Sequence, residues 1–170
     1  FDRNKADGDW LRQVIEDVLH PNLAYERKHP NLLTRFSEYI SRHEGTKQTK
    51  GQIENLYRKI TRYVAYNREI MRNKEFNLFV ETISLEDMND FRDYVANEHL
   101  LYLEHPDFYK DYIPAQYKPK EKSNTTIINT MNLLCVFLHW CKKMGYTSNE
   151  TFLQYGCKVP VYGDPFYLSI

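Results

Sequence analysis

Two short stretches of this sequence combine residue types that bind phosphate groups. Each joins lysine with small hydroxyl or amide side chains, at a point where we expect a helix to begin. Backbone N–H groups are free at the start of a helix, and phosphate oxygens accept hydrogen bonds from them and from lysine. The residues concerned are Thr46, Lys47, Thr49 and Lys50 in the first stretch, and Lys120, Lys122, Ser123, Asn124, Thr125 and Thr126 in the second.

The helices that we expect after these stretches carry side chains able to recognise bases. Asn55, Arg58, Lys59 and Arg62 follow the first stretch, and Asn129 follows the second. In the major groove of DNA, arginine pairs with guanine and asparagine pairs with adenine. These residues therefore predict binding to double-stranded DNA. The alternative is that they form ordinary solvated helix faces.

The distribution of charge agrees with this prediction, although the total charge does not. The formal net charge at pH 7 is zero, from 23 Lys and Arg and 23 Asp and Glu. Residues 46–74 hold eight Lys or Arg against two Glu, whereas residues 75–111 hold ten acids against two bases. Residues 118–143 hold five lysines against one Glu. The neutral total hides two basic blocks that an acidic block separates.

The sequence indicates no other kind of reactive site. The six His are scattered without an HExxH pattern, so we predict no metal site. Cys135, Cys141 and Cys157 lack CxxC spacing and are expected to be buried thiols in a reducing cytosol. The glycine-bounded loop 45–51 lacks the GK[ST] signature of a nucleotide-binding loop. We therefore predict no catalytic residue, no metal and no cofactor.

The elements that must position the basic residues are predicted to be helices, which makes the fold class all-α. Apolar residues at spacings of three and four predict helices over 10–19, 32–43, 52–72 and 124–143, and another from 84 to between 97 and 103. Between them we expect a basic loop over 46–51, an extended connector or short strand over 75–83, and a loop or short helical insertion over 105–122. The predicted N-caps are Asp9, Asn31, Ser84, and Ser123 or Asn124.

The longest of these helices is expected to bury one stripe and to expose its charge. Its stripe contains Ile53, Leu56, Ile60, Tyr63 or Val64, Asn67 and Met71. Arg58, Lys59, Arg62 and Arg68 fall outside that stripe, so we expect most of this charge to face away from the core.

The order of these pieces resembles a known family. The similar segments are Leu33-Thr34-Arg35-Phe36-Ser37-Glu38-Tyr39-Ile40, Gly45-Thr46-Lys47-Gln48-Thr49, the stretch from Phe79 to Val95, and the stretch from Asn124 to Tyr146. Together they are similar to the N-terminal, SAM-like core-binding domain of phage-integrase-type tyrosine recombinases, in the form found in Bacteroides-type mobile elements. The closing Asp164-Pro165-Phe166-Tyr167-Leu168-Ser169 resembles the entry to the catalytic domain of that family.

The resemblance implies a four-helix core-binding bundle with an additional N-terminal helix. It divides the chain into an extension over 1–29, the core-binding domain over 30–158, and a linker over 159–170 that leads into an absent catalytic domain. The extension is expected either to pack on the bundle or to be the remnant of a preceding DNA-binding domain. In the family, the second and fourth bundle helices contact DNA. Those helices correspond to residues 46–62 and 120–132, the two basic stretches described above.

The resemblance also implies partners and a setting. We expect the chain to be the DNA-binding, non-catalytic part of a longer recombinase that integrates or recombines DNA. Its partners would be double-stranded DNA, its own catalytic domain and other copies on DNA, in the bacterial cytoplasm, at the nucleoid, and with no membrane. The alternative is a helical protein-interaction module without DNA binding, whose acidic block docks a basic partner. An intact enzyme is the least favoured reading, because no convergent set of reactive residues is visible.

Overall fold

The computed structural model describes residues 8–21, 25 and 28–155. The described residues form helices without any strand, which confirms the predicted all-α class. The elements are α1 (Gly8–Leu19), α3 (Leu32–Arg42), α4 (Lys47–Glu69), α5 (Leu85–Glu104), α6 (Pro106–Lys110), α7 (Asn124–Lys143) and the short 3-10 helix η2 (Thr151–Tyr155).

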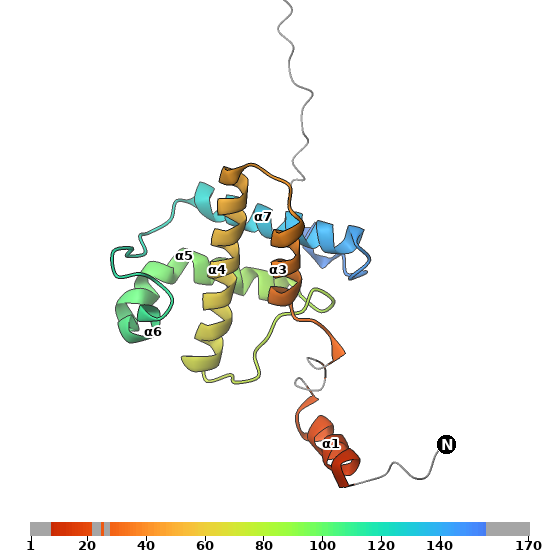
Figure 1. The fold of residues 1–170 in the computed structure, drawn as a ribbon. Coiled ribbons are helices and arrows are strands. Elements are labelled where there is room, and N and C mark those ends of the chain that lie inside the picture. The colour runs from red at the N-terminus through yellow and green to blue at the C-terminus, as the bar shows by residue number, and fades with distance from the viewer. Residues whose placement is uncertain (1–7, 22–24, 26–27, 156–170) are drawn as a thin grey trace, which may run out of the picture.

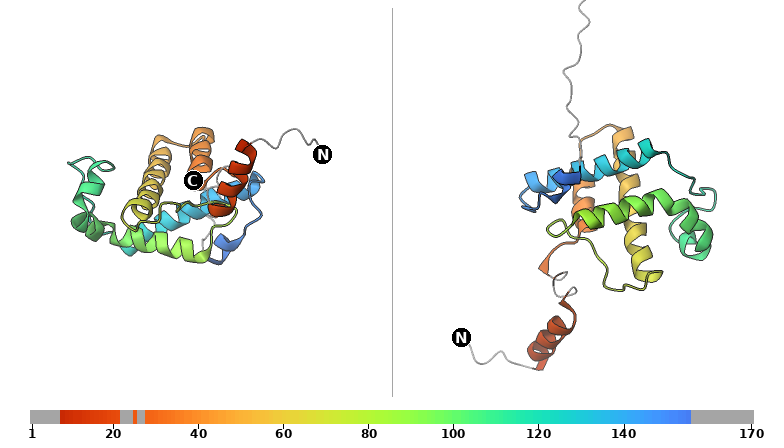
Figure 2. Two further views of the ribbon diagram at one scale, coloured as in Figure 1. Left: turned by 90° about the horizontal axis from the view of Figure 1, so that it is seen from below. Right: turned by 180° about the vertical axis from the view of Figure 1, so that it is seen from behind.

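The helices α3, α4, α5 and α7 pack in two layers. The helices α3 and α4 run antiparallel in one layer, and α5 and α7 run antiparallel in the other and cross them steeply (Figures 1 and 2). All of them contribute to one core, in which Phe36, Ile60, Phe91 and Phe137 are almost completely buried. Phe152 of η2 closes this core against α5 and α7. Because each helix buries an apolar stripe against the others, the layers fix where the basic segments lie.

The predicted helix starts are confirmed for three helices. Asn31 caps α3 by accepting a hydrogen bond from the Thr34 N–H, and Ser123 caps α7 through the Thr126 N–H. Ser84 and Asp87 form a reciprocal capping box at the start of α5. The structure therefore places these boundaries where the cap residues predict them.

The start of α4 differs from the prediction. The helix begins at Lys47, not at Gln52, so the expected basic loop over 46–51 is instead the first part of the helix. Thr46 is the N-cap, and its hydroxyl accepts a hydrogen bond from the Thr49 N–H. Gly51 costs helix stability but does not end a helix that is capped and packed on both sides of it. Lys47 and Lys50 therefore extend from helical backbone.

The stripe of α4 is confirmed only in its first part. Ile53, Leu56, Ile60 and Tyr63 are buried, but Met71 lies beyond the helix and is exposed. The chain then turns through Arg72, whose φ of 59° is left-handed. Residues 76–79 form a connector without regular structure, a turn follows at 80–82, and the Leu78 carbonyl accepts a hydrogen bond from the Leu32 N–H. The alternative of a short strand there is not seen.

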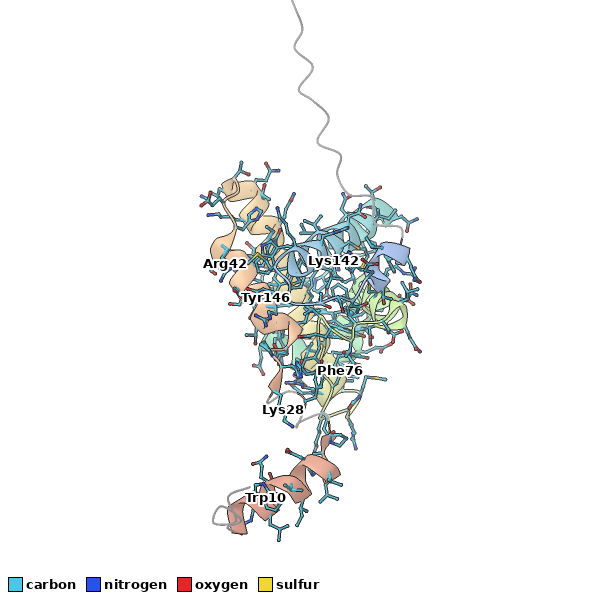
Figure 3. All side chains as sticks on the ribbon, turned by 90° about the vertical axis from the view of Figure 1, so that its right-hand side faces the viewer. Trp10, Lys28, Arg42, Phe76, Lys142 and Tyr146 are labelled. Carbon is cyan, nitrogen blue, oxygen red and sulfur yellow. The ribbon has the colours of Figure 1, made fainter. Side chains whose placement is uncertain are left out.

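Helix α1 covers the range 10–19 that was predicted to be helical, but its apolar stripe is exposed. Helix α1 begins at Gly8, so Asp9 lies inside it and is not its N-cap as predicted. Leu11, Val14, Ile15 and Val18 are all exposed, Val18 to 74%. Figure 3 shows Trp10 on this helix, apart from the layers that hold Arg42 and Tyr146. The stripe predicted the helix correctly, yet it does not pack into the core.

The predictions for the cysteines have different outcomes. Cys141 is a buried free thiol as predicted. Cys135 is also buried, but it is disulfide-bonded, so the prediction of a free thiol is wrong for that residue. Cys157 and the predicted linker over 159–170 lie outside the described residues.

Candidate nucleic-acid interface

Residues of α4 that follow the first basic stretch and residues of the second basic stretch, far apart in sequence, line the same surface of the molecule. Helix α7 crosses α4 where the Lys59 ammonium donates a hydrogen bond to the Thr130 hydroxyl, with an N–O distance of 3.2 Å. The start of α7 therefore lies beside residues 52–59 of α4. Two adjoining hollows share Asn55, Lys59 and Thr126 in their walls.

The first hollow, which we name the basic cleft, has a volume of about 580 Å³. Residues of α4, of the 105–122 segment and of the start of α7 line it. Its charged lining consists of six cations and one carboxylate: Arg58, Lys59, Arg62, Lys118, Lys120, Lys122 and Glu98. Its remaining lining residues are Asn55, Tyr112, Ile113, Pro114, Tyr117, Pro119 and Thr126. Such a cleft attracts anions.

The second hollow, which we name the amide groove, has a volume of about 470 Å³ and is lined only by α4 and α7. Amide side chains from both helices face it: Gln52, Asn55, Asn129 and Asn132. Gln52, Asn55 and Asn129 are exposed. Amide groups donate and accept at once, which suits them to the edges of bases.

Five exposed lysines and arginines form what we name the outer cations: Lys47, Lys50, Arg58, Lys118 and Lys120. Lys47, Lys50 and Arg58 are spaced so that they follow one side of α4. Arg58 is 69% exposed and meets Glu54 at 3.6 Å, an exposed pair that holds it weakly. These side chains keep their hydration and can approach a phosphate without first breaking a buried contact.

The predicted hydroxyl and amide ligands at the helix starts are also accessible. Asn124 and Thr125 are exposed in the first turn of α7. The hydroxyls of Thr46 and Thr49 bond to each other, as do those of Ser123 and Thr126, at 2.9 and 3.0 Å. Their first role is therefore to cap α4 and α7, and contact with phosphate stays a prediction.

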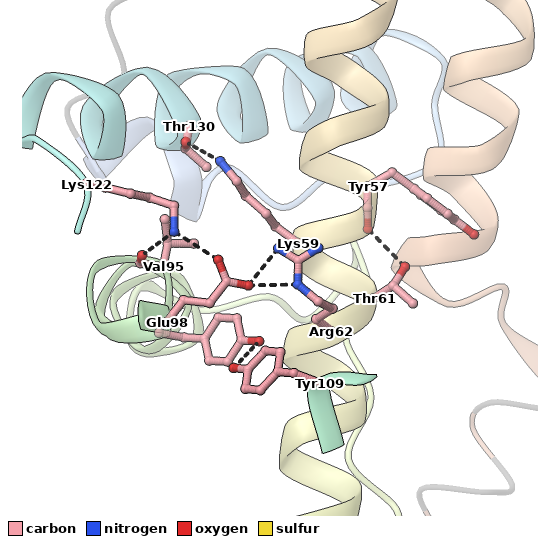
Figure 4. A network of polar contacts seen from close by, with 10 residues as sticks. Tyr57, Lys59, Thr61, Arg62, Val95, Glu98, Tyr109, Lys122 and Thr130 are labelled. Atoms are coloured by element: carbon pink, nitrogen blue, oxygen red, sulfur yellow. Dashed lines mark hydrogen bonds and ion pairs between the residues drawn. The ribbon is translucent and has the colours of Figure 1, made fainter. Parts of the chain in front are cut away.

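The remaining predicted cations, Lys59, Arg62 and Lys122, are what we name the inner cations, and they do not face away from the molecule. Arg62 is 9% exposed and binds Oε1 of Glu98 through Nε at 2.7 Å and Nη2 at 2.6 Å (Figure 4). Lys122 donates to Oε2 of Glu98 at 2.9 Å and to the Val95 carbonyl at 3.2 Å. The prediction that α4 exposes this charge is therefore wrong for Lys59 and Arg62, because α5 and α7 cover that side of the helix.

Glu98 holds this network together. It is 2% exposed. Its burial alone would raise its pKa, but the charges and hydrogen bonds of Arg62 and Lys122 outweigh burial and hold the pKa below its usual range. The carboxylate is thus ionised and joins α4, α5 and the residues before α7.

Lys59 is buried beside this network with weaker compensation. It is 8% exposed. Burial lowers the pKa of Lys59 to about 8, and the charges of Lys122 and Arg62 lower it while Glu98 raises it. Among the described residues, no carboxylate forms an ion pair with its ammonium group.

The 105–122 segment forms one wall of the basic cleft without covering the start of α7. The short helix α6 anchors it, because Tyr109 is fully buried and its hydroxyl lies 3.1 Å from that of Tyr94. Tyr112 donates a hydrogen bond to Glu69 at 3.0 Å. Beyond these anchors, Tyr117 and Lys118 are exposed at the rim. The predicted short helical insertion is confirmed in α6.

Sequence reasoning missed several residues that line the basic cleft. In the sequence, Glu98 is one of the ten acids of the acidic block. In the structure, it continues the buried series Met88, Phe91 and Val95 of α5 at helical spacing. A lone carboxylate on an apolar stripe is the signal that could have found it. Nothing in the sequence indicates that Tyr112 and Tyr117 approach α4, since they come from an irregular segment.

Within residues 8–21, 25 and 28–155, no three side chains of metal-binding type are grouped together. The helices of the described residues also include none that is long and apolar enough to span a membrane. A scan against protein-family models, a search of curated proteins and a search of solved structures each found no match to this chain.

Proposed function

We propose that this chain binds double-stranded DNA across the surface formed by the basic cleft and the amide groove. One observation carries the proposal: residues between 52 and 62 and residues between 120 and 132, from two stretches predicted separately to bind DNA, line the same two hollows. Phosphates would be bound by the outer cations and by the free N–H groups at the starts of α4 and α7. Bases would meet Gln52, Asn55 and Asn129.

In this proposal, α3, α4, α5 and α7 are the SAM-like, four-helix core-binding bundle of a tyrosine recombinase or integrase. The chain would be the non-catalytic part that clamps the recombination site, and a catalytic domain would clamp the opposite side. The support is the resemblance in residues 33–49, 79–95 and 124–146 together with the helical order. We assign no catalytic residue to this chain.

A four-residue variant tests DNA binding without disturbing the inner cations. Lys47, Lys50, Arg58 and Lys120 are each changed to alanine, and binding to a labelled duplex is followed by fluorescence anisotropy at several salt concentrations. We expect most of the affinity to be lost. The slope of log affinity against log salt should also fall by up to about 3.6, since each of the four lost phosphate contacts removes about 0.9. The helical circular dichroism signal should stay unchanged, because these side chains are exposed.

A control with the same charge change elsewhere makes the result specific. The changes Arg12→Ala, Lys28→Ala, Lys74→Ala and Lys143→Ala remove four exposed cations that line neither hollow and are not among the outer cations. This control should keep most of the duplex affinity. Equal losses in the two variants would refute the proposed surface. A salt-insensitive complex with a protein, and no complex with any duplex, would favour the protein-interaction module instead.

A further inference from the structure

The inner part of the basic cleft holds three cations and a single carboxylate. Lys59 and Arg62 are each more than nine-tenths buried, and the Lys122 side chain is 15% exposed. Arg62 engages Oε1 of Glu98 and Lys122 engages Oε2, so both oxygens of the carboxylate already have partners. The inner part of the cleft therefore holds more buried positive charge than negative charge.

An excess of buried positive charge is costly, because the protein interior solvates an ion less well than water does. The Lys59 ammonium has three N–H groups, of which one is directed to the Thr130 hydroxyl. It also lines both hollows, where an incoming group can reach it. An anion in the cleft would supply the missing negative charge and accept the remaining hydrogen bonds.

We propose that the basic cleft is a phosphoryl-binding site, in which a phosphate group lies between Lys59 and Lys122 and is surrounded by the outer cations Arg58, Lys118 and Lys120. This inference deepens the proposed function and rests on it for the source of the phosphate, the DNA backbone. Six cations around one cleft suit a multiply charged phosphate or a chain of phosphates better than a single carboxylate.

The state of Lys59 gives this site a measurable signature. The pKa of Lys59 is about 8, because burial and the charges of Lys122 and Arg62 lower it while the charge of Glu98 raises it. The exposed side chains of Arg58, Lys118 and Lys120 also line this cleft. A bound anion favours the charged ammonium and so raises this pKa. By linkage, anion affinity falls as the pH rises through about 8. Sulfate and phosphodiesters keep their charge over this range, so the change would come from the protein.

The test uses the whole chain and two probes, sulfate and a short DNA duplex, at pH 7 and pH 9. Sulfate binding is followed by NMR shifts of the amides of residues 118–126, against sodium chloride at equal ionic strength. The key variant is Lys59→Met, which removes a buried charge and keeps the length of the side chain, so it should fold. Lys143→Met is the matched control, since Lys143 is exposed, lines neither hollow and is not one of the outer cations.

For the wild-type chain we expect saturable sulfate binding that weakens severalfold between pH 7 and pH 9. Lys59→Met should bind sulfate about ten-fold more weakly at pH 7 and lose the pH dependence, whereas Lys143→Met should behave like the wild type. If sulfate acts no differently from chloride, or if Lys59→Met binds sulfate as the wild type does, the phosphoryl site is refuted, even where the duplex still binds. If the sulfate results are as expected but no duplex binds, the site stands with a free phosphate as its ligand, and the DNA-binding proposal fails.

Discussion

The outer and inner cations share residue types and segments, yet they occupy different environments. Arg58 and Arg62 are one helical turn apart on α4, but Arg58 is 69% exposed and Arg62 is buried against Glu98. Lys120 and Lys122 show the same contrast before α7. The covering helices α5 and α7, and not the residue type, therefore determine whether a cation is available to a ligand or stabilises the fold.

The largest effect that would test this contrast is expected for Arg62→Ala. It leaves the buried Glu98 with one of its two cationic partners, and breaking a buried pair in this way costs about 3–5 kcal/mol of the free energy of unfolding. Arg58→Ala should change that free energy by less than about 0.5 kcal/mol, since its pair with Glu54 is exposed. Urea unfolding of both variants measures the difference. Equal effects would mean that the two arginines do not differ as described.

Acid should weaken the inner network and leave the outer cations as they are. The pKa of Glu98 is lower in the folded chain than its ordinary value of 4.5, so its stabilisation is complete above that value and is lost as the pH falls through the folded pKa. We therefore expect Glu98→Gln to be less stable than the wild type at neutral pH, with a gap that narrows toward low pH. Unfolding curves recorded from pH 6 to pH 3 would show this, and a constant gap would contradict it.

The next effect appears at alkaline pH and concerns Lys59. Between its folded pKa of about 8 and its ordinary value of 10.5, the unfolded chain binds a proton that the folded chain does not. The free energy of unfolding should therefore rise with pH in this window, by about 3 kcal/mol in all, relative to a chain that lacks the group. Lys59→Met supplies that reference. The free energy of unfolding of the wild type should rise relative to that of the variant between pH 8 and pH 10. If it does not, burial does not destabilise the charged form of Lys59.

The smallest effect is expected at the start of α7. Ser123→Ala removes the hydroxyl that accepts the Thr126 N–H bond and should cost about 1 kcal/mol in unfolding free energy. Thr125→Ala is the control, because Thr125 is exposed in the first turn and is not the N-cap. Thermal unfolding compares the two. If both cost the same, the Ser123 cap does not stabilise the helix start.

The fold could largely be predicted because its signals are local. Asn31, Ser84 and Ser123 predict helix starts by the chemistry of their own side chains, and the stripe from Ile53 to Tyr63 predicts a buried face. The start of α4 was missed because Gly51 indicated a loop, while the Thr46 cap and the packing of the helix favour helix. The stripe of α1 predicts a helix but not what covers it, since periodicity contains no information on partners.

The location of the candidate site could be predicted from the sequence, but the burial of its inner cations could not. The charge blocks predict which segments are basic, and those segments do meet in space. The burial of Lys59 and Arg62 depends on Glu98, which lies 36 positions beyond Arg62, and on the crossing of α4 by α7. The spacing of residues within α4 contains no information on such long-range pairs. The sequence therefore does not show whether residues beside the apolar stripe are exposed to solvent or covered by another helix.

The most direct test of the central claim is a map of backbone amides that change when a short DNA duplex is added to the whole chain. Two-dimensional NMR at moderate salt would follow each amide during the titration. We expect the largest shifts in residues 47–62 and 118–132, with little change in α1 and on the acidic exposed side of α5. Shifts concentrated on α1 or on α5, with the basic cleft unaffected, would contradict it.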